Sequence, residues 1–134
     1  MSLDRNELVE ISERYFGSCN HHDFQSVMDT FAPSCRMWFP AATFEYLGKE
    51  ALGIHFEEFL GTFSTINFHD YHHIVDPLAQ SICTYFWVEL MQSTGERIKM
   101  RNCNIFHLDA NGVFKEIIIY NSGALDAGFH AGSE

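Results

Sequence analysis

Residues 81–121 read SICTYFWVELMQSTGERIKMRNCNIFHLDANGVFKEIIIYN, and this stretch decides the fold. It holds three runs of apolar or alternating residues, which are separated by two short polar segments, STGE and DANG. Short segments of this kind join neighbouring antiparallel strands. The stretch therefore predicts a sheet whose strands run back and forth. The predicted strands are residues 81–91, 97–108 and 113–121.

Apolar residues at helical spacing lie ahead of these strands. Asp4, with Glu7 three residues later, forms a capping-box signature that predicts the start of a first helix. Asp23 caps a second helix, whose apolar positions reach Phe31 and which Pro33 prevents from continuing. The remaining predicted elements are a short strand at 35–39, a loop at 41–47, a third helix from 48 to about 63 and a strand at 66–75.

This order of elements predicts an α+β domain. Three helices with one short strand among them precede a four-strand antiparallel meander, and no β-α-β alternation is present. Such an order is typical of helices packed on one face of a curved sheet. A chain of 134 residues forms one domain over 1–134, and we expect its ends, 1–3 and 123–134, to be frayed.

Composition excludes several classes of partner. With 18 acidic and 8 basic side chains the net charge is −10, which argues against nucleic-acid binding. No apolar run approaches the ~20 residues of a membrane span, and the acidic N-terminus does not resemble a signal peptide. The four cysteines show no C-x-x-C spacing, so we expect a cytoplasmic protein with reduced thiols. The 13 Phe, 5 Tyr and 8 His residues predict a region that is lined with rings.

Two asparagines lie among apolar neighbours on one predicted strand face. Asn102 and Asn104 alternate with Met100 and Phe106, whereas Arg101 belongs to the opposite, basic face. Buried amides need partners, because an unpaired one costs roughly 1–3 kcal/mol. The pair indicates either the wall of a pocket or a structural hydrogen-bond network.

Glu89 is the acidic residue of an otherwise apolar strand. It shares a face with Tyr85 and Trp87, and burial beside aromatic rings would raise the pKa of its carboxyl. Glu89 is therefore a candidate general acid or base. The alternative is an edge residue that pairs with a basic side chain across the hairpin.

Histidines and tyrosines supply the other candidates for proton transfer. His69, Tyr71 and His73 share one face of their strand, and a histidine that points inward could move protons near neutral pH. A metal site at His69 and His73 is disfavoured, because strand positions four apart lie ~13 Å apart. Tyr15 and His55 lie on the apolar faces of their helices, where each either donates into a cavity or bonds to the backbone.

Short motifs resemble the SnoaL-like and ketosteroid isomerase-like group of the nuclear-transport-factor-two-like superfamily. They are Tyr15 in the first helix, Asn20-His21-His22-Asp23-Phe24, Phe31-Ala32-Pro33, the strand that ends at Pro40, and Gly48-Lys49-Glu50-Ala51. The resemblance implies a cystatin-like cone: a strongly curved, mainly antiparallel sheet whose open side is closed by three N-terminal helices around an internal apolar pocket. It also implies a homodimer that forms through the sheet.

The resemblance assigns family roles to three positions. Tyr15 matches the tyrosine that donates to the oxyanion in ketosteroid isomerases, and Asn104 replaces their protonated aspartate. Phe39 stands where those enzymes keep the aspartate base, so this chain lacks their route. Related dehydratases and cyclases use a histidine on the strand after the third helix, where His69 and His73 lie.

We therefore expect a lyase or isomerase that performs a cofactor-free dehydration, isomerisation or cyclisation on a small apolar molecule with a carbonyl group. In this hypothesis His73 or His69 is the base, Glu89 assists, and Tyr15 and Asn104 donate to the oxyanion. The expected substrate-binding residues are Phe39, His55, Phe56, Tyr71, Trp87 and Asn102, with no metal. The alternative is a non-catalytic ligand-binding or dimerisation module on the same fold.

Overall fold

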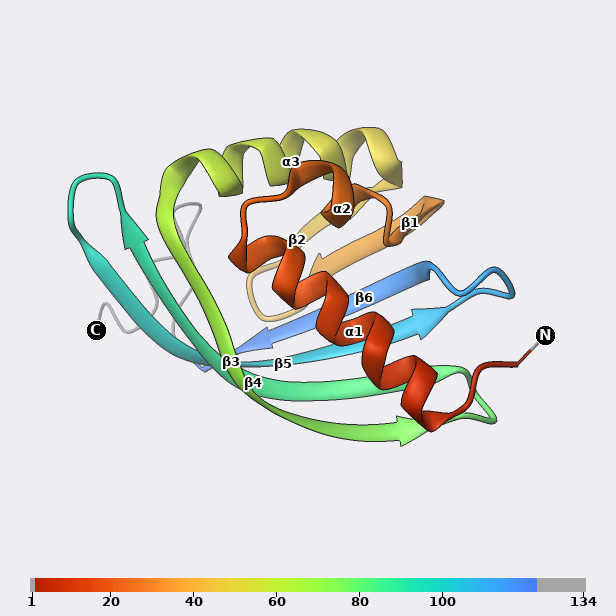
Figure 1. Ribbon diagram of the computed structural model, residues 1–134. Coiled ribbons are helices and arrows are strands. Elements are labelled where there is room, and N and C mark those ends of the chain that lie inside the picture. Colours follow the sequence, from red (N-terminus) through yellow and green to blue (C-terminus); the bar gives the residue numbers. More distant parts are fainter. Residues whose placement is uncertain (1, 123–134) are drawn as a thin grey trace.

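The computed structural model describes residues 2–122. In chain order the elements are α1 (Arg5–Asn20), α2 (Phe24–Met28), β1 (Phe31–Phe39), β2 (Phe44–Leu47), α3 (Gly48–Thr62), β3 (Phe63–Asp76), β4 (Ser81–Gln92), β5 (Arg97–Leu108) and β6 (Phe114–Asn121). The sheet is strongly bent, and the helices lie across its concave side (Figure 1). The α+β class and the curved sheet are thus confirmed.

The six strands form one sheet in the order β2-β1-β6-β5-β4-β3. The predicted antiparallel meander is confirmed in β3 to β6. Strand β1 joins it in parallel to β6, and β2 pairs with β1 at the edge. The predicted loop at 41–47 is thus partly wrong, because its second half forms β2.

The second helix ends earlier than the prediction placed it. It ends at Met28, and Phe31 already pairs with Phe114 of β6 as the first residue of β1. The backbone N–H of Phe114 donates to the Thr30 carbonyl at 2.8 Å, which fixes this entry to the sheet. The exposed Pro33 lies where the register shifts, and a proline, which lacks an N–H, is tolerated at such an irregularity.

Aromatic rings fill the space between α1 and the concave face of the sheet. The Phe16 ring centroid lies 4.5 Å from that of Phe86 and 5.0 Å from that of Tyr71. Phe106 stacks on Phe114 with centroids 4.5 Å apart. The capping box of Asp4 and Glu7 is present. It fixes where α1 begins, and so which of its side chains reach these rings.

A β-bulge divides β3 into two halves. The pairing with β4 shifts between His69 and His72, and Asp70 has a φ of +59°, a left-handed value that is uncommon for a residue with a side chain. Before the bulge Phe68 points inward, and after it Tyr71 points inward. The bulge therefore reverses which alternate residues face the core.

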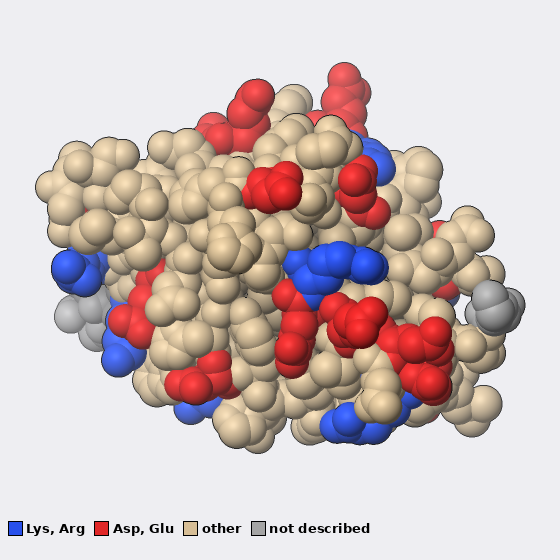
Figure 2. Space-filling model, viewed as in Figure 1, with Lys and Arg blue, Asp and Glu red and all other residues tan. Residues whose placement is uncertain are grey.

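Acidic side chains gather over α1 and α3 on the helix-bearing face of the molecule (Figure 2). This distribution accords with the net charge of −10. No helix within residues 2–122 is long and apolar enough to cross a membrane. The expected frayed end at 123–134 lies outside the described residues, whereas Leu3 exchanges two backbone hydrogen bonds of 2.9 Å with the Gln80 side chain.

Candidate functional site

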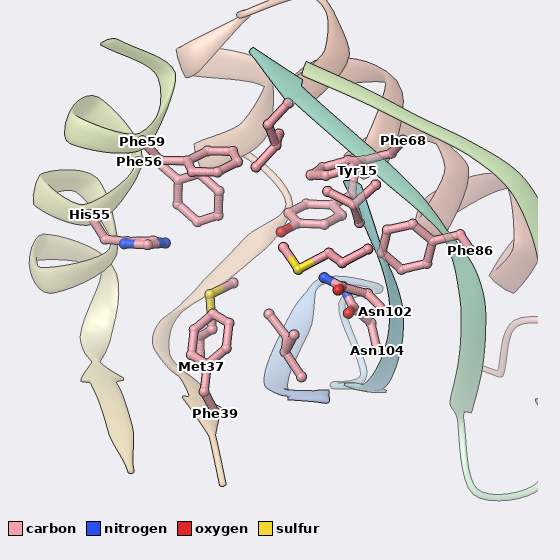
Figure 3. Close-up of a pocket in the computed structure, with 14 residues that line it drawn as sticks. Tyr15, Met37, Phe39, His55, Phe56, Phe59, Phe68, Phe86, Asn102 and Asn104 are labelled. Carbon is pink, nitrogen blue, oxygen red and sulfur yellow. The ribbon is translucent and has the colours of Figure 1, made fainter. Parts of the chain in front are cut away.

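A cavity lies between α1, α3 and the concave face of the sheet (Figure 3). Its volume is about 40 Å³, and its wall is almost entirely apolar. The lining residues are Tyr15, Met37, Phe39, His55, Phe56, Phe59, Phe68, Phe86, Val88, Leu90, Met100, Asn102, Asn104 and Ile119. Six of the predicted site residues thus meet in one place: Tyr15, Phe39, His55, Phe56, Asn102 and Asn104.

Helix α1 brings the Tyr15 phenol to the cavity. The ring is held edge-on by Phe106 and Phe114, with centroids 5.6 and 5.7 Å away. Burial, with a smaller contribution from Cys19, raises the pKa of Tyr15 well above its usual value, so the group stays a protonated donor. The thiol of Cys19 lies beside the phenol and is a weak acceptor, so a ligand oxygen would compete well for this donor.

Strand β5 brings two amides to the same cavity. Asn104 is 3% exposed, and its Oδ1 is buried without a hydrogen-bond donor among the described residues. The neighbouring Asn102 is half-buried, and its Oδ1 accepts a 2.7 Å hydrogen bond from Nδ2 of Asn121. Natural structures satisfy nearly all buried polar atoms, so the open Oδ1 of Asn104 marks a place for a donor from beyond residues 2–122.

Helix α3 contributes the basic group of the cavity, His55. Its imidazole stacks on Tyr46 with ring centroids 4.3 Å apart and meets Phe56 edge-on at 4.9 Å. Burial lowers the pKa of His55 to about 4, so the ring is neutral at physiological pH. A neutral imidazole at a cavity wall can accept a proton or a hydrogen bond.

The cavity is narrow in this conformation. At about 40 Å³ it holds a few water molecules, whereas sites for larger ligands span roughly 300–1,000 Å³. Two of its walls are Met37 and Met100, whose unbranched side chains change rotamer easily. A bound ligand must therefore displace these flexible side chains.

The structure places His69 and Glu89 on the outer face of the sheet, away from the cavity. His69 Nε2 lies 2.5 Å from the Glu89 carboxylate, and His69 Nδ1 lies 3.1 Å from Asp70. The prediction that His69 faces inward is wrong, because the bulge at Asp70 breaks the alternation on which it relied.

His73 and Tyr71 do face inward, although they pack under α1 instead of lining the cavity. His73 Nε2–H donates to Glu13 of α1 at 2.7 Å, and Nδ1 shares a 2.8 Å hydrogen bond with the hydroxyl of the buried Thr84. Tyr71 donates to the Phe68 carbonyl at 2.8 Å. The two bonds of His73 attach β3 to α1 and β4, whereas the bond of Tyr71 stays within β3; both residues have structural roles.

Trp87, Tyr85 and Glu89 point outward, contrary to the prediction. In the β4–β5 register Phe86 lies opposite Asn102 and Thr84 opposite Asn104, and opposite residues share a face. The even-numbered residues of β4 therefore face the cavity. A one-residue difference in register exchanges the two faces of a strand.

Sequence reasoning missed over half of the cavity wall. Phe86, Val88 and Leu90 were hidden because β4 is apolar on both faces, so periodicity alone does not separate the inner set. Phe59 and Phe68 lie in segments recognised as apolar, and the helical spacing of Phe59 from His55 was the available signal.

Comparison with known proteins agrees with this architecture. A family model described as a SnoaL-like domain matches residues 12–117. AusH from Aspergillus nidulans resembles the chain with a TM-score of 0.78 at 17% identity, over 96% of this chain and 93% of that one. A putative SnoaL-like polyketide cyclase from Shewanella denitrificans OS-217 has a TM-score of 0.77 at 12% identity, over 89% and 92%.

A protein of unknown function with a cystatin-like fold from Methylobium petroleophilum PM1 has a TM-score of 0.74 at 14% identity, over 100% of this chain and 90% of that one. At such identities the likeness concerns the fold alone. No curated protein matches the sequence. Because the family model covers most of the chain and the cone-shaped fold agrees with it, the protein belongs to the SnoaL-like domain family.

Proposed function

We propose that the protein is a pocket enzyme that transfers a proton, without a cofactor, on a small apolar molecule with a carbonyl group. The observation that carries the proposal is the apolar cavity in which a protonated phenol, an unpaired amide oxygen and a neutral imidazole meet. Dehydration, isomerisation and cyclisation all need a proton acceptor near a carbon atom and a donor at the carbonyl oxygen.

In this proposal Tyr15 donates to the carbonyl oxygen as negative charge develops there. A neutral phenol in an apolar site stabilises such charge more strongly than water does. Asn104 cooperates with it from β5. The same pair was expected from the sequence, and the structure brings both residues to one cavity.

The base in this proposal is His55, because His69, His73 and Glu89 do not line the cavity. With its pKa lowered to about 4, His55 is always deprotonated at neutral pH but is a weak base. It suits a substrate whose proton is already acidic, such as one between two carbonyl groups.

The unpaired Oδ1 of Asn104 narrows the substrate class further. An acceptor buried to this extent favours a ligand that presents a hydroxyl, enol or N–H donor. An enol formed from a ketone has such a group, so Asn104 would bind the product of proton transfer better than the ketone.

A non-catalytic ligand-binding module is the second candidate. One observation favours it: Tyr15 and His55 are the titratable residues of the cavity wall, and no carboxylate is among its 14 lining residues. Strong proton abstraction usually relies on a base whose pKa is nearer to neutral pH.

Proton exchange in D2O separates the two candidates without knowledge of the natural substrate. The probe is 2-tetralone, an apolar bicyclic ketone with acidic α-hydrogens, and ¹H NMR follows their replacement by deuterium. We expect the wild type to accelerate exchange and Tyr15→Phe to slow it by about 100-fold. Tyr120→Phe, the same change at an exposed tyrosine of β6, is the matched control.

The outcomes discriminate sharply. Saturation transfer from protein to probe with no faster exchange favours the binding module. Exchange that persists in both Tyr15→Phe and His55→Phe places the chemistry outside this cavity. Neither binding nor exchange contradicts the proposed class of substrate.

A matched pair of ligands tests the part played by Asn104. 2-Naphthol carries a hydroxyl donor and 2-methoxynaphthalene does not, and fluorescence gives the affinity of each. A hydrogen bond worth about 1 kcal/mol predicts roughly five- to tenfold tighter binding of the naphthol. Asn104→Leu should abolish this preference. An unchanged preference would mean that the hydroxyl of 2-naphthol donates to a group other than Asn104.

A further inference from the structure

Two cysteines lie side by side on the outer face of the sheet. The Sγ atoms of Cys83 on β4 and Cys103 on β5 are 3.4 Å apart, and both side chains are half-buried and free. Cys83 lies opposite Ile105 and Cys103 opposite Tyr85, so the two thiols are diagonal neighbours on one face. The two sulfurs are thus already in contact, and a disulfide requires them to approach to about 2.05 Å.

The two thiols differ in access. Cys103 lines a surface recess beside Tyr85, Arg101 and Tyr120, which a small thiol reagent can enter. Cys83 does not line that recess, and burial together with the contact to Cys103 raises the pKa of Cys83 to about 11. Cys103 is therefore suited to react first, and Cys83 to react with whatever becomes attached to Cys103.

We propose that Cys83 and Cys103 form a dithiol site that reacts reversibly with a low-molecular-weight disulfide. The Cys103 thiolate attacks one sulfur of the small disulfide, which gives a mixed disulfide and releases one small thiolate. The Cys83 thiolate then attacks the Cys103 sulfur and releases the second small thiolate. The protein loses two electrons and two protons, and the small disulfide gains them as two thiols.

The other two cysteines provide an internal contrast. Cys19 and Cys35 are both 0% exposed. Burial raises the pKa of Cys35 to about 12 and that of Cys19 further still. Because the thiolate is the reactive form, neither should react in the folded protein.

The position of Cys103 gives the site a structural context. It lies on β5 between Asn102 and Asn104, and its side chain is on the opposite face of the strand. A covalent link to β4 would therefore form directly behind the two amides of the cavity. The dithiol chemistry itself needs no ligand in the cavity, so it stands apart from the proposed enzymatic function.

Oxidised glutathione is the probe for this site. Dilute native protein is incubated with it, and intact mass and peptide mapping follow the products. We expect the wild type to lose two hydrogens and to yield one peptide pair joined through Cys83 and Cys103. Dithiothreitol should restore the original mass. Cys83→Ser should stop at a glutathione adduct on Cys103, and Cys103→Ser should stay unmodified.

Cys35→Ala is the matched control, because it removes a buried cysteine and should form the same link as the wild type. A stable adduct on Cys103 of the wild type would overturn the proposal, since Cys83 would then not resolve it. A lack of reaction, or equal reaction at Cys19 and Cys35, would overturn it as well.

Discussion

Strands β4 and β5 have different chemistry on their two faces. On the inner face Phe86 and Met100 line the cavity among uncharged neighbours. On the outer face the Trp87 ring lies between two cations, with Lys99 Nζ 4.9 Å and the Arg101 guanidinium carbon 4.7 Å from its centroid. Rings alone therefore do not mark the site, because the chain is rich in rings on both faces. The site is marked instead by the few polar side chains, among them Tyr15, His55 and Asn104, that stand among apolar residues at one cavity.

The largest expected effect comes from truncating a side chain on the inner face of β4, compared with truncation of the adjacent residue on the outer face. Phe86 is 1% exposed and packs on Phe16, so Phe86→Ala should lower the free energy of unfolding by about 3–5 kcal/mol. Trp87→Ala, one residue away but half-buried, should cost clearly less. Urea denaturation measures both. Similar losses in the two variants would contradict the division between the faces.

The half-buried His55 of α3, which lines the cavity, should make stability depend on pH. The pKa of His55 is lowered to about 4 in the folded state, against about 6.5 in an unfolded chain. Stability is therefore fully present above about pH 6.5 and is lost as the pH falls, because only the unfolded chain takes up the proton. The loss amounts to about 3 kcal/mol by pH 4. His55→Phe should remove this part of the slope in urea titrations at several pH values, and an unchanged slope would show that His55 protonates in place.

At Asn104, in contrast, a substitution is expected to raise the stability of the fold. Its Oδ1 is buried and no donor within residues 2–122 reaches it, so Asn104→Leu should raise the free energy of unfolding by about 1 kcal/mol while it weakens ligand binding. Asn102→Leu is the matched change, and it should destabilise the fold because Asn121 loses its acceptor. If Asn104→Leu also destabilises the fold, its amide has a structural partner in solution.

The smallest effect is expected on the outer face. His69 and Glu89 form a partly exposed pair, so a double-mutant cycle with His69→Gln and Glu89→Gln should give a coupling energy below about 1 kcal/mol. Exchange of 2-tetralone protons should be unaffected by either change. Loss of proton exchange in Glu89→Gln would instead indicate that this carboxylate takes part in the proposed proton transfer.

The fold was largely predictable because its signals are local. The capping box at Asp4 and the two hairpin turns each depend on a few adjacent residues. Strand β2 and the parallel pairing of β1 with β6 were not predictable from such signals. The parallel pairing depends on contacts between segments about 80 residues apart, such as Arg36 with Glu116, and β2 pairs with β1 at the edge of the sheet.

The candidate site was predictable only in part. Helical spacing and the amide pair identified Tyr15, His55, Asn102 and Asn104, all of which line the cavity. The family resemblance contributed Phe39. The predicted base failed, because the direction of a strand residue depends on every bulge and on the register with its neighbours. Dimerisation through the sheet stays a prediction.

The bulge at Asp70 has a consequence for the divergence of such chains. Simple alternation from Phe68 over the same residues would turn His72 inward and His73 to solvent, so the extra residue at Asp70 is what brings His73 under α1. A relative with the same histidines, but with this strand paired without a bulge, would therefore present His72 to its interior. In this architecture the gain or loss of a bulge can change which imidazole faces inward without any amino-acid substitution.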